Sequence, residues 1–444
     1  MSALPHILSF YDLILTPIYF FILLAWVILW KRKYYHNSPY KKYIIPAFII
    51  KVICCILLAL LYEFYYGFGD PHNYYTGAVE IWTATKENPL YGLELVFKPI
   101  NQYSPAVQEF ATHISYPAFS GEIVNIFKVS GFIGMFCFGT YLPIALFISL
   151  LSFIGSWKIF IVFAEEFPTH YKKIALTCLF VPSFVFWSTN ILKDPLAIYG
   201  LGLCVSALYN LMKGRHSFLI ILQMLAGAYI MFSFKIYVFY IFCIAAFFSI
   251  GVHLISNSTS KFLMRLAVFL LLLLLTIWGV SQKDYLFEAI SVGVMKTVMT
   301  VQNVQKDQGG SAYVISNVEN GNPLGIIRTY LQSLNVALFR PYFWESSNVI
   351  VFANALESSA VLLFTVYLLI KSKIIGFFTF AFKNRVLTFA LVFTFLLAPL
   401  AGLISFNFGT LVRYKAPVVP FYYTYLILLY YKTKEKANEN YIKS

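Results

Sequence analysis

One carboxylate stands in a segment that would present it just outside a membrane span. Asp70 follows a long apolar run and lies in the stretch 65–77, which is rich in glycine and tyrosine. A carboxylate in this setting can act as a general base, bind a metal or hold a sugar. It can also cap a helix, and the sequence leaves these roles open. The neighbouring residues that would take part in binding are His72, Tyr74 and Tyr75.

Cations, carboxylates and a tryptophan recur at the ends of later apolar runs and in the polar segments between them. Arginine and lysine bind phosphate oxygens and stabilise a leaving phosphate, a carboxylate can take a proton from a hydroxyl group, and aromatic faces stack on sugar rings. The combination favours group transfer from a lipid-linked phosphate or pyrophosphate. The candidates are Lys193, Asp194, Lys235, Arg328, Arg340, Trp344, Glu345, Glu357, Arg413 and Lys415.

Each candidate also has a structural interpretation. Lys193, Lys235 and Arg413 would serve as interfacial anchors whose charged ends reach water. Asp194 precedes a proline and would cap the following helix, and His72 would be an ordinary loop histidine. Glu357 is harder to explain structurally, because a carboxylate inside an apolar run needs a partner or a task.

The composition indicates a membrane protein. The chain is 60% hydrophobic and only 12% charged, with a mean hydropathy of +0.73. Repeated apolar runs of about 18 or more residues are typical of transmembrane helices, and they lack the alternation of barrel strands. We therefore predict one all-α polytopic transmembrane domain over residues 1–444. We expect about 11 spans, at approximately 13–30, 43–66, 132–164, 174–190, 196–212, 218–234, 236–255, up to 280, 349–370, 386–406 and 417–431.

Two long polar segments, 67–130 and 281–348, are expected to lie on the outer face. The first should form amphipathic helices along the interface, and 132–164 should comprise an interfacial helix plus a span. In the second we expect helices at 284–305 and 324–339, separated by a mobile loop at 306–323.

The net charge of +14 is best explained by orientation in a membrane and not by nucleic acid. Basic residues concentrate in the short loops, such as Lys31–Lys33, and in the tail, which places these in the cytoplasm and the N-terminus outside. The six cysteines fall in apolar runs without metal-ligand spacing, so we predict neither disulfides nor a thiolate cluster.

The layout resembles the GT-C class of integral membrane glycosyltransferases, in which the first outer loop carries an acidic residue, here Asp70 in GDPHNYY. The segments FWSTNILKDPL (186–196), FRPYFWE (339–345) and VRYKAPVVPF (412–421) also look like parts of bacterial envelope-polysaccharide proteins, some of which resemble O-antigen polymerases. The resemblance implies a polyprenyl-phosphate sugar donor. GT-C members often have two adjacent acids, whereas Asp70 stands alone, so dependence on Mg²⁺ or Mn²⁺ stays open.

The sequence thus predicts a glycosyltransferase of the bacterial inner membrane that moves a sugar from a polyprenyl-phosphate or polyprenyl-pyrophosphate carrier to a glycan acceptor. Asp70 would be the base or would position the acceptor, and the 306–323 loop would act as a lid. The carrier phosphate would be held by Lys193, Lys235, Arg340 and Arg413. Two alternatives are a polymerase or ligase of lipid-linked oligosaccharides, and a transporter or flippase for the lipid-linked sugar. Transporters usually keep their charges near the middle of the bilayer, whereas these cluster on one predicted face.

Overall fold

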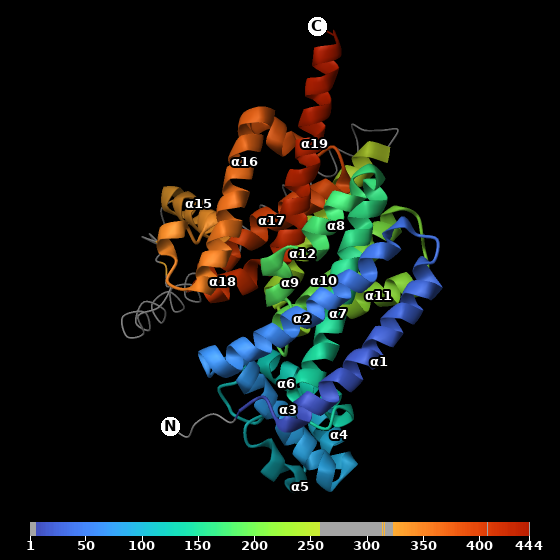
Figure 1. Ribbon diagram of the computed structural model, residues 1–444, viewed down its shortest axis with the longest axis vertical. Coiled ribbons are helices and arrows are strands. Elements are labelled where there is room, and N and C mark those ends of the chain that lie inside the picture. Colours follow the sequence, from blue (N-terminus) through green and yellow to red (C-terminus); the bar gives the residue numbers. More distant parts are fainter. Residues whose placement is uncertain (1–5, 258–312, 314, 316–322, 406, 444) are drawn as a thin grey trace. The chain divides into compact units, whose positions relative to one another are not determined.

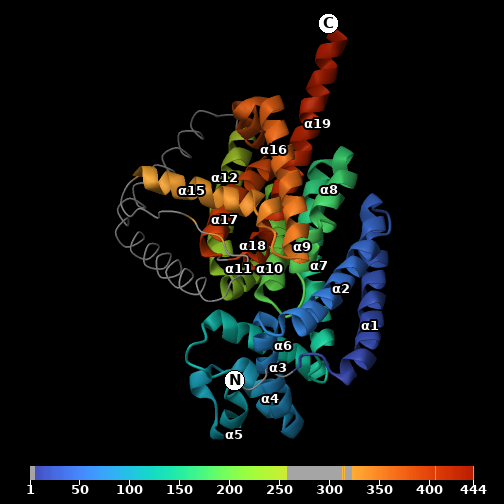
Figure 2. The same ribbon diagram turned by 60° about the vertical axis from the view of Figure 1, so that its left-hand side comes forward.

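The computed structural model describes residues 6–257, 313, 315, 323–405 and 407–443, and most of them are helical (Figures 1 and 2). The chain divides into two compact units, Met1–Phe239 (unit 1) and Tyr240–Ser444 (unit 2). Each unit is described by itself below. The prediction of a single domain over the whole chain stays a prediction.

Seven helical stretches of the described chain are long and apolar enough to cross a membrane. They confirm the prediction of a helical, polytopic membrane protein. An eighth apolar helix, α11 (Phe218–Phe234), is shorter. The expected count of about 11 spans stays a prediction, because the eighth expected span lies outside the described residues. The seven are Phe10–Tyr35, Pro39–Tyr66, Tyr141–Glu166, Lys193–Met212, Ile236–Ile255, Val349–Ala381 and Arg385–Ile404.

Unit 1 is built around α7 (Tyr141–Glu166), most of whose residues are buried. The helices α1 (Phe10–Tyr35) and α2 (Ile44–Leu61) lie along one side of it, and α10 (Lys193–Met212) packs between α7 and α11 (Figure 1). Glycines allow the α7 and α10 backbones to touch. A Cβ atom on Gly202 would lie 2.2 Å from the carbonyl oxygen of Gly155, so only glycine fits this crossing.

The expected span at 174–190 is not one continuous helix. It consists of α8 (Tyr171–Leu179) and the short α9 (Pro182–Trp187), followed by a non-helical stretch before α10. Pro182 explains the break, because proline cannot donate a backbone hydrogen bond within a helix. Ser188, Thr189 and Asn190 are fully buried in this stretch, where the protein itself must supply their hydrogen-bond partners.

The first predicted polar segment forms short helices that gather at one end of unit 1 (Figures 1 and 2). The chain leaves α2 through a π-helical turn, and Gly67 ends that turn in the left-handed conformation, with φ of 68°. The Glu80 carboxylate holds the group together by accepting hydrogen bonds from the backbone N–H groups of His113 and Ile114. The helices are α3 (Asp70–Glu87), α4 (Pro89–Phe97), α5 (Pro105–Gln108) and α6 (Gly121–Phe136).

Unit 2 contains most of α12 (Ile236–Asn257), together with α15 (Pro323–Phe339), α16 (Val349–Ala381), α17 (Arg385–Ile404), α18 (Phe408–Lys415) and α19 (Val419–Lys443). Its core forms where α17 packs against both α15 and α19, and α16 packs beside α19. The helix α16 is interrupted at Lys373, whose φ of 58° and ψ of 157° are not helical.

This connectivity gives unit 2 two polar ends. The segment after α15, the start of α16 and the helix α18 lie at one end of the long helices. The far end of α16, the start of α17 and the end of α19 lie at the other. The predicted helix at 284–305 and the loop at 306–323, apart from Tyr313, Ile315 and the start of α15, lie outside the described residues.

Candidate functional site

The best-defined ion pair of unit 1 joins two predicted site residues. Asp194 lies in the first turn of α10, one residue after the helix begins, and Lys235 follows α11. The Lys235 ammonium group donates a hydrogen bond to the Asp194 carboxylate, and their side chains are only 4% and 1% exposed. Lys235 is therefore not a lipid-facing anchor. Because a buried charge is costly without its partner, each side chain holds the other in place.

A second pair lies next to the first in the sequence. The Lys193 ammonium group is 2.9 Å from a carboxylate oxygen of Glu122 in α6. Both side chains are partly exposed, so this pair contributes little to stability. The pair instead connects the first turn of α10 with α6, one of the short helices at the end of unit 1.

The stretch before α10 carries a buried polar network that sequence analysis missed. Asn190 adopts a φ of 78°, which asparagine tolerates better than most residues. Its side-chain oxygen accepts hydrogen bonds from the Tyr141 hydroxyl and the Ile191 N–H, and its amide donates to the Cys55 carbonyl. Nearby, the buried Lys51 ammonium group donates to the Ser188 hydroxyl. A lysine inside a span indicates a functional position.

Asp70 is the first residue of α3 and is half-buried. An acidic side chain is stabilised in the first turn of a helix, so this position agrees with the structural alternative as well as with a catalytic one. His72, near the start of α3, is buried, and its Nδ1 atom has no hydrogen-bond partner among the described residues. Burial lowers the pKa of His72, whereas the Glu63 carboxylate acts in the opposite direction. The histidine is thus held mainly neutral.

Glu63 is a second carboxylate near His72, and it lies within the expected span at 43–66. One of its oxygens lies 2.5 Å from Nδ1 of His6, and the other accepts the Ile7 N–H at 3.0 Å. The Glu63 side chain is only 4% exposed. It therefore holds the N-terminal segment against the end of α2. His6 and Ile7 are far from Glu63 in the sequence, so no local sequence pattern predicts these contacts.

The two tyrosines predicted to bind a sugar are engaged in packing within unit 1. Tyr74 is 3% exposed, and its ring lies edge-to-face against Phe127. Tyr75 donates its hydroxyl to the Gly139 carbonyl at 2.8 Å, and its ring meets Tyr141. Their ring faces are therefore less accessible than a stacking platform requires.

In unit 2, Arg340 forms the centre of a second group of predicted residues. Its guanidinium group donates to both carboxylate oxygens of Glu345. The same group lies 5.5 Å from the ring centres of Tyr313 and Phe408, a cation–π arrangement on two aromatic faces. Burial alone would raise the pKa of Glu345, but the hydrogen bonds from Arg340 and from the Tyr342 N–H outweigh it and lower the pKa. Glu345 is therefore held as a carboxylate.

Lys415 is buried beside this pair at the end of α18 and is only 5% exposed. Its ammonium nitrogen has two long contacts, 3.4 Å to the Ser358 hydroxyl and 3.5 Å to the Arg340 carbonyl. Burial lowers the pKa of Lys415 to about 8, opposed by the nearby Glu357 carboxylate. Contacts of this length are at the weak limit of hydrogen bonding. The ammonium group can therefore donate a stronger hydrogen bond to an anion that lies closer.

Glu357 and Trp344 complete this group, which we name the Arg340–Lys415 site. Glu357 lies about 12 Å along α16 from its start, from the helical rise, and accepts a hydrogen bond from the Tyr423 hydroxyl at 2.9 Å. Trp344 is 81% exposed and stacks on Tyr342. The site comprises Arg340, Tyr342, Trp344, Glu345, Glu357, Ser358 and Lys415.

The remaining predicted residues of unit 2 differ in their surroundings. Arg328 lies in α15 and is exposed, whereas Arg413 lies in α18 and is 8% exposed. Among the described residues, no group of three or more histidine, cysteine, aspartate or glutamate side chains is arranged to hold a metal ion. The structure thus pairs Asp194 with Lys235 in unit 1 and brings Arg340, Glu345 and Lys415 together in unit 2, but it does not gather all of the predicted residues into one site.

The chain matches no protein-family model, no curated protein and no solved structure. The functional argument therefore depends on the geometry of these groups.

Proposed function

We propose that the protein is a membrane-embedded glycosyltransferase that takes its sugar from a polyprenyl-phosphate carrier. The observation that carries this proposal is Lys415, a buried ammonium group near the Glu357 carboxylate whose two hydrogen-bond contacts within the described part of the chain are both long. A buried cation is costly unless an anion or several good acceptors compensate it. A carrier phosphate would supply oxygens at closer distance, and the membrane setting supplies the route for its lipid tail.

The other residues of the Arg340–Lys415 site fit the rest of such a substrate. The exposed face of Trp344, backed by Tyr342, offers the platform on which a sugar ring can stack. The Arg340–Glu345 pair fixes the segment that carries Trp344, because Glu345 also accepts the Tyr342 N–H. The positive charges would stabilise the phosphate as it leaves.

The reaction requires one proton acceptor. An acceptor hydroxyl attacks the anomeric carbon, the bond between that carbon and the phosphate oxygen breaks, and the hydroxyl proton passes to a carboxylate. Glu357 is the carboxylate near Lys415 within this site, and Asp70 of unit 1 is the base predicted from the sequence. The substitutions Asp70→Asn and Glu357→Gln distinguish the two carboxylates. Only the substitution of the true base should abolish sugar transfer while the protein still binds the donor.

The test is transfer of labelled sugar in proteoliposomes supplied with a panel of polyprenyl-phosphate sugars and an extract of membrane glycans as acceptor. We expect transfer by the wild-type chain and a loss of at least about a hundredfold in the base variant. Glu109→Gln is the control, since Glu109 is an exposed carboxylate outside the proposed site. Wild-type rates in both Asp70→Asn and Glu357→Gln would refute the catalytic assignment.

A second candidate function is transport of the lipid-linked sugar. The observation in its favour is the interrupted stretch of α8 and α9 with the buried Lys51–Ser188 contact, because transporters often build their sites from discontinuous helices. Movement of a labelled polyprenyl-phosphate sugar across the proteoliposome membrane without sugar transfer, and its loss in Lys51→Met, would favour this function over the first.

A further inference from the structure

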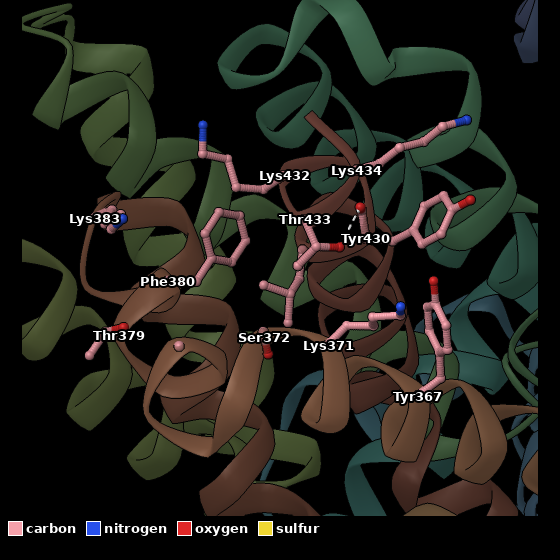
Figure 3. A pocket seen from close by; sticks show the side chains of 12 residues that line it. Tyr367, Lys371, Ser372, Thr379, Phe380, Lys383, Tyr430, Lys432, Thr433 and Lys434 are labelled. Carbon is pink, nitrogen blue, oxygen red and sulfur yellow. Dashed lines mark hydrogen bonds between the residues drawn. The ribbon is translucent and has the colours of Figure 1, made fainter. Parts of the chain in front are cut away.

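The end of unit 2 that carries the far part of α16 and the end of α19 contains a cavity of about 550 Å³. Among the described residues, four lysines line it and no carboxylate does. In Figure 3, Lys371 and Tyr367 rise from α16 toward Tyr430 of α19, and Lys383 lies beyond Phe380. The two other lysines, Lys432 and Lys434, come from α19.

Little within the described part of unit 2 neutralises these charges. The ion pair seen at the cavity joins Lys432 to Glu435, at 3.6 Å and between exposed side chains. A pair of this kind contributes little. Lysines gathered around one cavity repel one another, so an anion that enters it would be attracted by all of their charges.

The surface next to the cavity indicates where that anion comes from. Ile370, Ile374 and Ile375 flank Lys371 along α16, and they are 73%, 67% and 77% exposed. Ile370 lies on the apolar part of α16 before the break at Lys373, and Ile374 and Ile375 lie just after it. Exposed apolar surface thus borders the lysine on both sides and suits acyl chains. A phosphate in the cavity would then lie next to an apolar surface, which suits a phospholipid better than a soluble metabolite.

We propose that this cavity binds the phosphate group of an anionic phospholipid. The ammonium group of Lys371, beside the Tyr367 and Tyr430 side chains, contacts the phosphate oxygens. Lys383 and Lys432 lie elsewhere around the cavity in Figure 3 and attract the phosphate through their charge. Basic pockets between transmembrane helices bind anionic headgroups in this way. The site is separate from the Arg340–Lys415 site, because the two lie at opposite ends of the long helices of unit 2.

The test uses the full chain in neutral detergent, mixed with phosphatidylglycerol or phosphatidylcholine, with bound lipid counted by native mass spectrometry. Each lysine near an anionic headgroup contributes about a fivefold change in affinity, so Lys371→Gln with Lys432→Gln should weaken phosphatidylglycerol binding about thirtyfold. Lys172→Gln with Lys173→Gln removes the same charge from exposed lysines of unit 1 and should leave binding unchanged.

Two further measurements keep the result unambiguous. Lys371→Arg with Lys432→Arg retains the charges and should keep most of the binding, which separates loss of the site from loss of the fold. Inorganic phosphate at millimolar concentration should not displace the lipid. Equal binding by the Gln variant and the wild type would overturn the proposal, as would equal retention of phosphatidylcholine. Displacement by inorganic phosphate would overturn it as well and would assign the cavity to a soluble phosphate instead.

Discussion

The Asp194–Lys235 pair allows a quantitative prediction, because both side chains are almost completely buried. Replacing Lys235 by methionine leaves the Asp194 carboxylate without this cation. Removing one partner of a buried pair costs about 3–5 kcal/mol. The N-terminus of α10 offsets about 0.3–1 kcal/mol of this for the remaining carboxylate. We therefore expect Lys235→Met to lower the free energy of unfolding by about 3 kcal/mol.

The double variant Asp194→Leu with Lys235→Met removes both charges and should recover to within about 1 kcal/mol of the wild type, because apolar residues can replace a buried pair. The two substitutions should then couple by at least about 2 kcal/mol. The four proteins of this double-mutant cycle are the wild type, the two single variants and the double variant. Denaturant titrations in mixed micelles measure the free energy of unfolding of each. A Lys235→Met value within about 0.5 kcal/mol of wild type, or a double variant equal to the sum of the single ones, would refute the reasoning.

Three further predictions concern packing, pH and the sugar platform. Gly202→Ala should destabilise unit 1 by about 1–3 kcal/mol in the same titration, because its Cβ would meet the Gly155 backbone. Gly121→Ala, with open space around its Cβ, is the control. Binding of polyprenyl phosphate should weaken as the pH rises through about 8, where the Lys415 ammonium group loses its proton; Lys415→Arg should remove this dependence, and an unchanged pH profile would contradict it. Trp344→Ala should raise the KM for the sugar donor about two- to tenfold, and Trp344→Phe much less.

Deprotonation of Lys415 at rising pH should weaken phosphate binding but increase the free energy of unfolding. The pKa of Lys415 is about 8 in the folded chain, against 10.5 for an unburied lysine. The folded state therefore binds fewer protons than the unfolded state between these values. Stability should rise, not fall, as the pH increases from about 8 to 10.5, as linkage requires.

The apolar pattern was sufficient to predict most of the helices. The expected span at 218–234 coincides with α11, because Ser217 caps its start and Lys235 follows its end. The expected span at 174–190 was wrong as a single helix. Hydropathy averages over Pro182 and over the buried Ser188–Asn190 stretch, whose polar groups find partners in α2 and α7.

The candidate site was only partly predictable, because residue type predicts a charge but not its partner. Asp194, Lys235, Arg340 and Glu345 were identified from the sequence, yet nothing local pairs Asp194 with Lys235. Lys51 and Glu63 were missed, since each looks like one polar residue in or at the end of an apolar run. Asp12 was missed for the same reason, and its carboxylate accepts the Leu142 N–H from the start of α7.

The central claim is that Lys415 binds the carrier phosphate, and a direct binding measurement tests it. Affinity for polyprenyl phosphate is measured at pH 7 for the wild-type chain, Lys415→Met and the control Lys158→Met. Lys158 also donates to a neutral acceptor, Gln223, but in unit 1. A hydrogen bond to a charged group contributes about 1.5–3 kcal/mol, so Lys415→Met should weaken binding by about ten- to a hundredfold. The control should bind as the wild type does. Equal affinity in Lys415→Met and the wild type would contradict the claim.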